Sequence, residues 1–515
     1  MRSHTLLPYI TAVCAITAGL AGCGAGQKAG SKPPSSPIVI DPSIKGTRGE
    51  LLGTPTRVHS WDAQGLYTAM ANFGPTGTYL AGISGRLICG VDVYQFSYGT
   101  VGAAGEATTA SGALMVPTGD AQACLGSRSV VLYGHGNTQR RDANMADVRP
   151  DTPLGSAALT AIAMYASQGD VVVAPNYVGY HTSALGYHPH HIADQQSKDM
   201  IDALTAARKA LPTVAPSSQQ NGKLFITGFS EGGYAAMATH RAMQAAGMPV
   251  TASSPQGGAF AESVGFEKMM GAPNGLDNLD QVTPEQLLLY IMKFVGWQKA
   301  YGNIYSTPAD LFPAAYAAGL ESLLPSTLPA SQIRAKLPPY LLANDMPHYS
   351  RLTAAQQAYF GPPEQSLLKT SVIMAIQADI VAHPCPSTSA SAPLACSPSH
   401  PARKAWLNND MRDWVPTSPV LMCGGNADPV VGFPQAQLAL AYFEAHKVRP
   451  GLVTLLDVDS PASANDPHAL AKETFASFRL RYLRAGTDIM TGPIYHGSLA
   501  FMGCAVAGRE FFKRF

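Results

Sequence analysis

Short apolar runs alternate with longer amphipathic or alanine-rich runs through the middle of the chain. Apolar runs of about five residues bounded by turn residues are typical of buried strands, and longer periodic runs are typical of helices. We expect strands at 129–133, 170–175, 223–227 and 250–254, separated by helices at 154–167, 194–211 and 234–246. Strands that alternate with helices of this length predict a parallel sheet with helices on both faces.

The same alternation stops after residue 254 and resumes near residue 419. The later elements that we expect are strands at 419–423 and 452–458 and helices at 433–446 and 469–484. Two β-rich runs at 87–98 and 108–116 predict an antiparallel start to the sheet. We therefore predict an α/β core formed by residues 46–258 and 418–515, with a mostly parallel central sheet. Residues 259–417, which hold a helical patch at 285–301 and proline-rich turns, are predicted to be a helical cap inserted into it.

The N-terminus has the pattern of an export signal. Arg2 is followed by an apolar stretch at 6–20, and Leu20-Ala21-Gly22-Cys23 resembles the lipobox of bacterial lipoproteins. We expect a signal peptide at 1–22, a lipid anchor on Cys23, and a flexible tether at 23–45, which is rich in Gly, Ser, Lys and Pro. The protein would then be membrane-anchored, facing the periplasm or the cell exterior. An ordinary cleaved signal peptide with an incidental cysteine is the alternative.

Cysteine usage agrees with export. Cys14 lies in the signal and Cys23 at the lipid site, which leaves six cysteines that suggest three disulfides among fifteen possible connectivities. The pairs that we expect are Cys89–Cys124, Cys385–Cys396 and Cys423–Cys504. Buried free thiols are the alternative, and the absence of a C-x-x-C pair argues against zinc.

Composition limits the partners. Charged residues make up 13% of the 515 residues, against about 25% in typical soluble chains. The net charge is +1 and there is no dense Lys/Arg tract, so we expect no nucleic-acid partner.

Ser230 stands in Gly228-Phe229-Ser230-Glu231-Gly232, directly after a predicted strand and directly before a predicted helix. A nucleophile elbow holds its serine on such a sharp strand-to-helix turn, where small flanking residues prevent clashes between neighbouring segments. The helix N-terminus after Ser230 would also direct N–H groups at a developing oxyanion. We predict that Ser230 is a catalytic nucleophile.

A nucleophilic serine needs a histidine as base and an acid to orient that base, and after such an elbow the acid precedes the histidine in the chain. Asp428 follows the strand at 419–423 and is predicted as the acid, with Asp457 and Asp459 as rivals. His468, just before the last long helix predicted, is expected to be the base. The competing bases are His446 and His496.

The oxyanion hole is expected to use two backbone N–H groups. One is that of Glu231, directly after the nucleophile, and the other comes from the glycine-rich loop 133–138. Asn137 is the expected donor in that loop and Thr138 is the alternative.

Three other groups of residues invite a functional interpretation. His188, His190 and His191, with Asp194 nearby, suggest a metal site, but adjacent histidines point apart in most backbone conformations and we predict no metal. The apolar run 287–292 is interpreted as cap core, with a lipid-contacting surface as the alternative. Tyr177, Tyr180 and Tyr187 are expected to line an acyl pocket or to pack under the cap.

The motifs at 133–138, 174–179, 228–233 and 424–430 resemble those of the α/β-hydrolases of the secretory lipase type, which are exported lipases and esterases with a helical cap. This resemblance covers roughly residues 60–485. Asn176 stands where the family usually has aspartate, and Pro467 precedes His468 where glycine is usual. The resemblance implies an α/β-hydrolase fold and hydrolysis of carboxylic esters through an acyl-enzyme, without metal or organic cofactor.

We therefore expect a serine ester hydrolase that acts on small-molecule or lipid esters, as a monomer. A serine peptidase or amidase on the same scaffold is the first alternative. A non-catalytic surface binding lipoprotein is the second.

Overall fold

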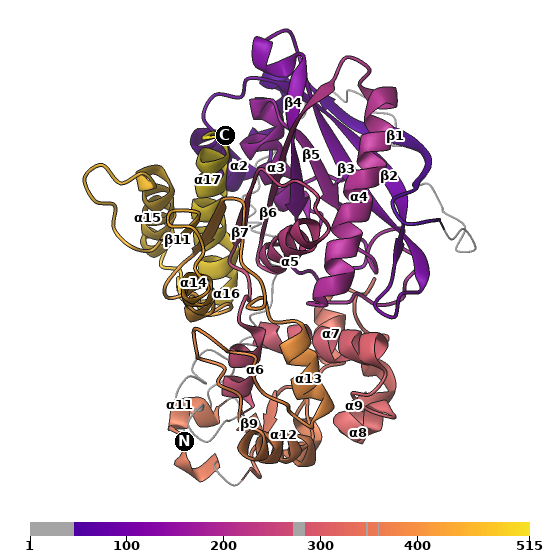
Figure 1. Ribbon diagram of the computed structural model, residues 1–515, viewed down its shortest axis with the longest axis vertical. Helices are drawn as coiled ribbons and strands as arrows, with labels where there is room; N and C mark the ends of the chain where they lie inside the picture. Colours follow the sequence, from indigo (N-terminus) through magenta and orange to yellow (C-terminus); the bar gives the residue numbers. More distant parts are fainter. Residues whose placement is uncertain (1–45, 271–283, 347–348, 359) are drawn as a thin grey trace, which may run out of the picture.

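The computed structural model describes residues 46–270, 284–346, 349–358 and 360–515 (Figure 1). The predicted signal peptide, the lipid site at Cys23 and the tether lie outside the described residues. They stay predictions.

A nine-stranded mixed sheet forms the centre of the fold. Its strand order is β1-β2-β3-β5-β4-β6-β7-β10-β11. The strands are β1 (Leu51–Trp61), β2 (Gly90–Val101), β3 (Ala107–Thr118), β4 (Ser127–Gly134), β5 (Val171–Pro175), β6 (Gln219–Phe229), β7 (Ala252–Gln256), β10 (Val420–Gly424) and β11 (Val453–Asp457). A separate two-stranded sheet pairs β8 (Leu342–Ala343) with β9 (Phe360–Gly361).

The sheet changes once from antiparallel to parallel pairing. Strands β1, β2 and β3 pair antiparallel, and β3 is also antiparallel to β5. From β5 to β11 every pair is parallel. The predicted antiparallel start and parallel remainder are therefore confirmed. Strand β1 was not predicted, because this edge strand has polar residues, no buried position and no apolar run.

Helices cover both faces of the sheet. Helices α4 and α5 pack against each other on one side, and α3 and α17 pack against each other on the other. The helices of the core are α1 (Ala63–Ala71), α2 (Gly74–Ile83), α3 (Gly155–Met164), α4 (Ala193–Val214), α5 (Glu231–Ala245), α14 (Pro434–Ala445), α15 (Ala469–Arg484), α16 (Gly492–Ile494) and α17 (Phe501–Phe512). The predicted fold class, a mostly parallel central sheet with helices on both faces, is confirmed.

A helical insertion separates two neighbouring strands. Strands β7 and β10 pair directly, with Ser253 opposite Val420, although more than 150 residues lie between them. The helices between them are α6 (Glu262–Met269), α7 (Pro284–Tyr301), α8 (Pro308–Leu311), α9 (Ala314–Leu320), α10 (Ala330–Ala335), α11 (Ala354–Gln357), α12 (Thr370–Ala382) and α13 (Pro401–Asn408). Figure 1 shows these helices gathered below the sheet. The exact limits that we predict for this cap, 259–417, stay a prediction.

The apolar run 287–292 belongs to helix α7. Its residues Leu287, Leu288, Ile291 and Met292 are buried, so most of the run forms core of the insertion. Among the described helices, none has both the length and the apolar character needed to cross a membrane.

The C-terminal helix α17 is a core element that was not predicted from the sequence. It packs against β6, β7 and β10 and is buried along most of its length. A disulfide from Cys504 in this helix to Cys423 in β10 fixes it to the sheet. The other two bridges are Cys89–Cys124 and Cys385–Cys396, so all three predicted disulfides are confirmed. Disulfides are typical of proteins in oxidising compartments outside the cytosol.

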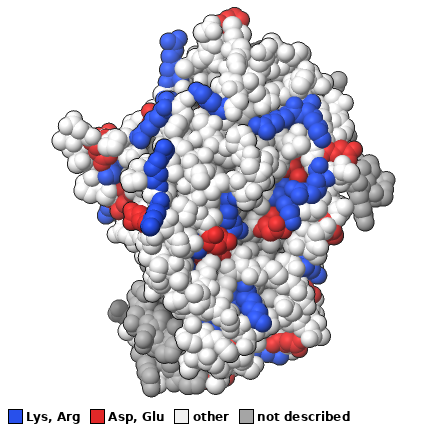
Figure 2. All heavy atoms as spheres, viewed as in Figure 1, with Lys and Arg blue, Asp and Glu red and all other residues white. Residues whose placement is uncertain are grey.

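Charged side chains are sparse on the face shown in Figure 2. Lysines and arginines lie interspersed with acidic residues over this face. Such a mixed pattern does not form the continuous basic surface that nucleic-acid binding uses.

Candidate active site

Ser230 occupies a strained turn between β6 and α5. Its backbone angles are φ 60° and ψ −123°, a conformation that residues with a Cβ rarely adopt. Its N–H donates to the carbonyl of Gln256 at 2.9 Å, which ties the turn to the end of β7. A side chain at Gly232 would collide with the backbone of Gly134, so glycine is required where the elbow meets β4. The predicted strand-turn-helix setting of Ser230 is confirmed.

The carboxylate of Asp428 is bonded to the imidazole of His496. Asp428 Oδ2 accepts a hydrogen bond from His496 Nδ1 at 2.6 Å. The other oxygen, Oδ1, accepts the backbone N–H groups of Val430 at 2.9 Å and Val431 at 3.1 Å. Both Asp428 and His496 are buried. With the Nδ1 proton directed at the carboxylate, the other ring nitrogen keeps its lone pair for accepting a proton.

The His496 ring lies beside the elbow. It packs against Phe229, the residue before Ser230, with a ring-centroid separation of 4.7 Å. A Cβ placed on Gly257 would be 2.9 Å from the Phe229 ring and 3.4 Å from the His496 ring. Among the described residues, buried His496 Nε2 has no hydrogen-bond partner. A buried imidazole nitrogen that is free to accept a proton therefore belongs to a ring that packs against the residue before the serine.

His468 is placed elsewhere. It occupies the N-cap position of α15, where its backbone N–H donates to Asp466 Oδ1 at 2.8 Å. Burial, together with the nearby Arg514 guanidinium, lowers the pKa of its imidazole. The pairing that we predicted for Asp428 with His468 is not the one in the structure, and the competing histidine His496 takes that place. The reason is α17: the chain continues past α15 and returns through residues 495–500 to the sheet, where α17 packs against β7 and β10.

The other rivals have structural contacts. His446 Nε2 bonds to the carbonyl of Ser391 at 2.7 Å. Asp457 Oδ1 accepts the N–H groups of Asn426 and Asp459 at 3.0 Å each, and so shapes the loop that leads to Asp428.

A π-helix at Tyr495–Ala500 carries His496 into α17. Such wide turns are rare and are frequent at functional sites. The Tyr495 hydroxyl donates to Asp459 Oδ2 at 2.7 Å and accepts the N–H of Ala427 at 3.0 Å. Ala427 directly precedes Asp428, and Tyr495 directly precedes His496. The buried Tyr495 hydroxyl therefore links the two segments that carry Asp428 and His496.

The loop after β4 passes directly over the serine. A Cβ on Gly136 would be 3.5 Å from Ser230 Cβ and 3.4 Å from the carbonyl oxygen of Phe229. The Tyr180 hydroxyl donates to the carbonyl of Thr138 at 2.8 Å and so supports the loop from below. The side chain of Asn137 points toward Glu231, with its amide nitrogen 3.3 Å from Glu231 Oε2. The two residues predicted to supply oxyanion donors are therefore brought together.

The three tyrosines of the sequence analysis are buried. Tyr177 and Tyr180 have no exposed surface, and Tyr187 is nearly buried. The Tyr177 hydroxyl donates to the carbonyl of His135 at 3.2 Å. Tyr177 and Tyr180 therefore pack beneath the loop after β4.

Asn176 fills the position where the family that the motifs resemble usually has aspartate. Its Oδ1 accepts the N–H of Met145 at 2.7 Å, and its Nδ2 donates to Ser111 Oγ at 2.9 Å and Asn144 Oδ1 at 3.0 Å. The amide thus makes three buried hydrogen bonds at the end of β5.

The histidine cluster divides between two buried carboxylates. His188 and His190 face Glu231, whereas His191 bonds to Glu262. Asp194 pairs instead with Lys198 at the surface. Ligand atoms of His188, His190 and Glu231 lie within 4.8 Å of one another, a spacing at which a metal ion could bind.

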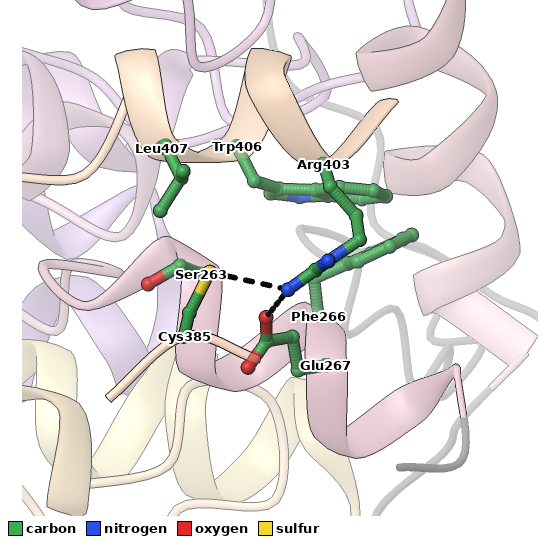
Figure 3. Close-up of a pocket in the computed structure, with 7 residues that line it drawn as sticks. All are labelled: Ser263, Phe266, Glu267, Cys385, Arg403, Trp406 and Leu407. Atoms are coloured by element: carbon green, nitrogen blue, oxygen red, sulfur yellow. Dashed lines mark hydrogen bonds and ion pairs between the residues drawn. The ribbon is translucent and has the colours of Figure 1, made fainter. Parts of the chain in front are cut away.

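A narrow gap inside the insertion is a poor candidate for a reactive site (Figure 3). It lies between α6, α13 and the segment around Cys385, and it is too narrow to hold a water molecule. Arg403 spans it, with a 2.8 Å ion pair to Glu267 and a contact of 3.1 Å to Cys385 Sγ. These contacts tie α13 to α6 and to the segment around Cys385 within the insertion.

Comparisons with known proteins support an ester hydrolase. No protein-family model matches the sequence, and a search of curated proteins gives no match. Among solved structures, the rice cell wall degrading esterase LipA from Xanthomonas oryzae, in a ligand-bound form, is 25% identical with a TM-score of 0.63. That similarity covers 91% of this chain and 100% of LipA. Candida antarctica lipase A in its closed state is 14% identical with a TM-score of 0.50, over 94% of this chain and 96% of the lipase.

These neighbours are lipases and esterases with the α/β-hydrolase fold, and this chain has the same fold. The similarity to LipA supports ester hydrolysis in general.

Proposed function

We propose that this protein hydrolyses carboxylic esters through an acyl-enzyme on Ser230, with His496 as general base and Asp428 as the acid that orients it. The observation that carries the proposal is the 2.6 Å hydrogen bond from His496 Nδ1 to Asp428, on a ring that packs against the residue before Ser230. This is the order serine, acid, histidine that α/β-hydrolases use.

In the acylation step, His496 Nε2 takes the proton of the Ser230 hydroxyl as the oxygen attacks the ester carbonyl carbon. The carbonyl oxygen becomes an oxyanion that the backbone N–H groups of Glu231 and Asn137 stabilise. His496 then gives its proton to the leaving alkoxide, so the alcohol departs and the acyl group stays on Ser230.

In the deacylation step, water gives a proton to His496 and attacks the acyl carbon. The resulting tetrahedral intermediate collapses, the carboxylic acid leaves, and the proton returns to the Ser230 oxygen. Asp428 stays ionised and stabilises the imidazolium in both steps.

The substrate class that we propose is a lipophilic or aromatic ester. The amide nitrogen of Asn137 lies 3.5 Å from the sulfur of Met292 in the apolar helix α7, so the insertion reaches the oxyanion loop. Together with a lipid anchor on Cys23, this arrangement favours an exported lipoprotein that meets apolar substrates at a membrane surface. We propose that it acts as a monomer.

Two measurements on the same preparation test the proposal. Hydrolysis of p-nitrophenyl esters of graded acyl length is compared with hydrolysis of aminoacyl p-nitroanilides, and we expect turnover of the esters. A fluorophosphonate probe should label wild type and leave Ser230→Ala unlabelled. Faster turnover of the anilides would favour the peptidase alternative. Equal labelling of wild type and Ser230→Ala would refute the proposal.

A further inference from the structure

The side chain of Glu231 lies in a buried polar cluster directly beside the elbow. Its Oε1 is 2.5 Å from His188 Nε2, 2.7 Å from Gln196 Nε2 and 3.0 Å from His190 Nδ1. Its Oε2 is 3.3 Å from Asn137 Nδ2. The carboxylate is completely shielded from solvent. A buried carboxylate is costly unless donors surround it, and here four donor groups from three separate segments do so.

The contacts of His188 determine its charge. Its Nδ1 lies 2.9 Å from the carbonyl oxygen of Val178, and its Nε2 lies 2.5 Å from Glu231 Oε1. Both partners are acceptors, so both ring nitrogens carry a proton and the ring is an imidazolium. Burial alone would lower the pKa of His188, but the Glu231 charge raises it above the ordinary value. His188 and Glu231 therefore form a buried ion pair with no net charge.

The same geometry argues against a metal ion in this cluster. His188 Nε2 and Glu231 Oε1 are within direct hydrogen-bond distance, whereas two ligands of one zinc ion lie farther apart. The amide groups of Gln196 and Asn137 also turn their N–H donors toward the carboxylate, and a cation at that place would be repelled by those groups. The cluster is therefore best described as a hydrogen-bonded ion pair.

The cluster joins the parts of the oxyanion hole. Glu231 begins α5 and directly follows Ser230, whereas Asn137 belongs to the loop after β4 that passes over the serine. Asn137 is half-buried, and its amide nitrogen also lies 3.5 Å from the sulfur of Met292 in helix α7. Asn137 thus links the Glu231 carboxylate at the elbow to helix α7 of the insertion.

We propose that the Glu231 side chain is a positioning residue: through Asn137 it holds the loop N–H at the distance that the oxyanion requires. This inference rests on the proposed esterase function. Its direct consequence is that neutralising the carboxylate weakens binding of the transition state more than binding of the ester itself.

The test uses Glu231→Gln, which keeps the size of the side chain and removes its charge. The matched control is Glu262→Gln. Glu262 is also a buried carboxylate, and it bonds to Lys293 and to His191, the residue after His190. Unlike Glu231, it does not contact Asn137. We expect kcat for a p-nitrophenyl ester to fall about 10- to 100-fold in Glu231→Gln with KM within about twofold, as a slightly misplaced oxyanion donor produces. The control should keep wild-type kcat.

An alkyl boronic acid provides the second readout, because its adduct with serine mimics the tetrahedral intermediate. Its inhibition constant should rise in Glu231→Gln by the same factor by which kcat falls, and should stay unchanged in Glu262→Gln. If Glu231→Gln does not fold, as judged by circular dichroism, Asn137→Ala replaces it and should show the same kcat loss with unchanged KM.

The outcomes separate this inference from the proposed function. A wild-type protein that turns over no ester defeats the proposed function. A wild-type protein that hydrolyses esters, while Glu231→Gln matches it in kcat and boronate affinity, overturns the inference alone. Equal losses in Glu231→Gln and Glu262→Gln would also overturn it, because they would indicate a general effect of removing a buried charge.

Discussion

The disulfide between Cys423 and Cys504 joins the strand that leads to the proposed acid to the helix that follows the proposed base. Cys423 belongs to β10, whose end leads into the Asp428 loop, and Cys504 belongs to α17, which follows His496. The bridge therefore holds the strand of the proposed acid against the helix that continues from the proposed base. We predict that the double variant Cys423→Ala/Cys504→Ala loses both stability and turnover.

The size of the stability loss follows from the length of chain that the bridge closes. Cys423 and Cys504 are 81 residues apart, and the chain-entropy relation gives about 4.5 kcal/mol for a loop of that length at 25 °C. Cys385 and Cys396 are 11 residues apart, which gives about 3 kcal/mol. Removal of the long bridge thus takes a large share of the roughly 5–15 kcal/mol that stabilises a folded protein. Cys385→Ala/Cys396→Ala is the matched control, because its bridge lies in the insertion.

The assay combines urea denaturation, followed by tryptophan fluorescence, with steady-state ester hydrolysis under conditions where both variants are folded. The Cys423/Cys504 variant should show the larger fall in unfolding free energy and a kcat about 10- to 100-fold below wild type, since small displacements of reacting groups carry such costs. The control variant should keep kcat. A Cys423/Cys504 variant with wild-type kcat would refute the claim that this bridge positions the acid and base.

Two further substitutions test neighbouring contacts. Burial would raise the pKa of Glu262, but the Lys293 ammonium, 2.9 Å from both of its oxygens, and the nearby His191 lower it to about 2. Between pH 4.5 and about 2, the folded protein therefore binds fewer protons than the unfolded chain. The ionised Glu262 thus contributes about 3 kcal/mol to stability above pH 4.5, and this contribution is lost as the pH falls to about 2. The difference in unfolding free energy between wild type and Glu262→Gln should shrink over that window, and a constant difference would contradict the assignment. Tyr495→Phe leaves Ala427 and Asp459 without their hydroxyl partner. It should lower the unfolding free energy by about 1–3 kcal/mol and kcat by about tenfold. Unchanged denaturation and turnover would contradict the role of Tyr495 as the link between the Asp428 and His496 segments.

The sequence was informative where local chemistry decides the structure. The elbow at Ser230 was predictable because its φ of 60° and its close contact with β4 require small neighbouring residues. Gly228 and Gly232 occupy those neighbouring positions. Asp428 was predictable as the acid candidate because it follows a buried strand in a short polar loop, and there the structure places it against an imidazole.

The histidine partner depended on tertiary structure. His468 and His496 both follow the last strand, and the choice between them depends on where α17 packs. A signal for His496 was present: the run 501–512 is largely apolar, as a buried helix requires, and the expected Cys423–Cys504 bridge already placed that run beside the Asp428 strand. Combining the two would have brought the His496 segment close to the acid.

The Glu231 cluster was beyond prediction for a different reason. Its members His188, Gln196 and Asn137 come from three segments, and their meeting depends on how α4, the loop after β4 and α5 pack together. Sequence spacing carries no record of such a convergence.

The most direct test of the proposed triad compares two histidine substitutions in ester hydrolysis and in fluorophosphonate labelling. His496→Ala should lower kcat by about 10³- to 10⁶-fold and nearly abolish labelling of Ser230, because loss of a triad member has effects of that size. His468→Ala should keep kcat within about threefold of wild type, since the hydrogen bond of His468 to Asp466 is made by its backbone N–H, which alanine keeps. A His496→Ala variant with near wild-type turnover, or a His468→Ala variant with the larger loss, would contradict the assignment of His496 as the base.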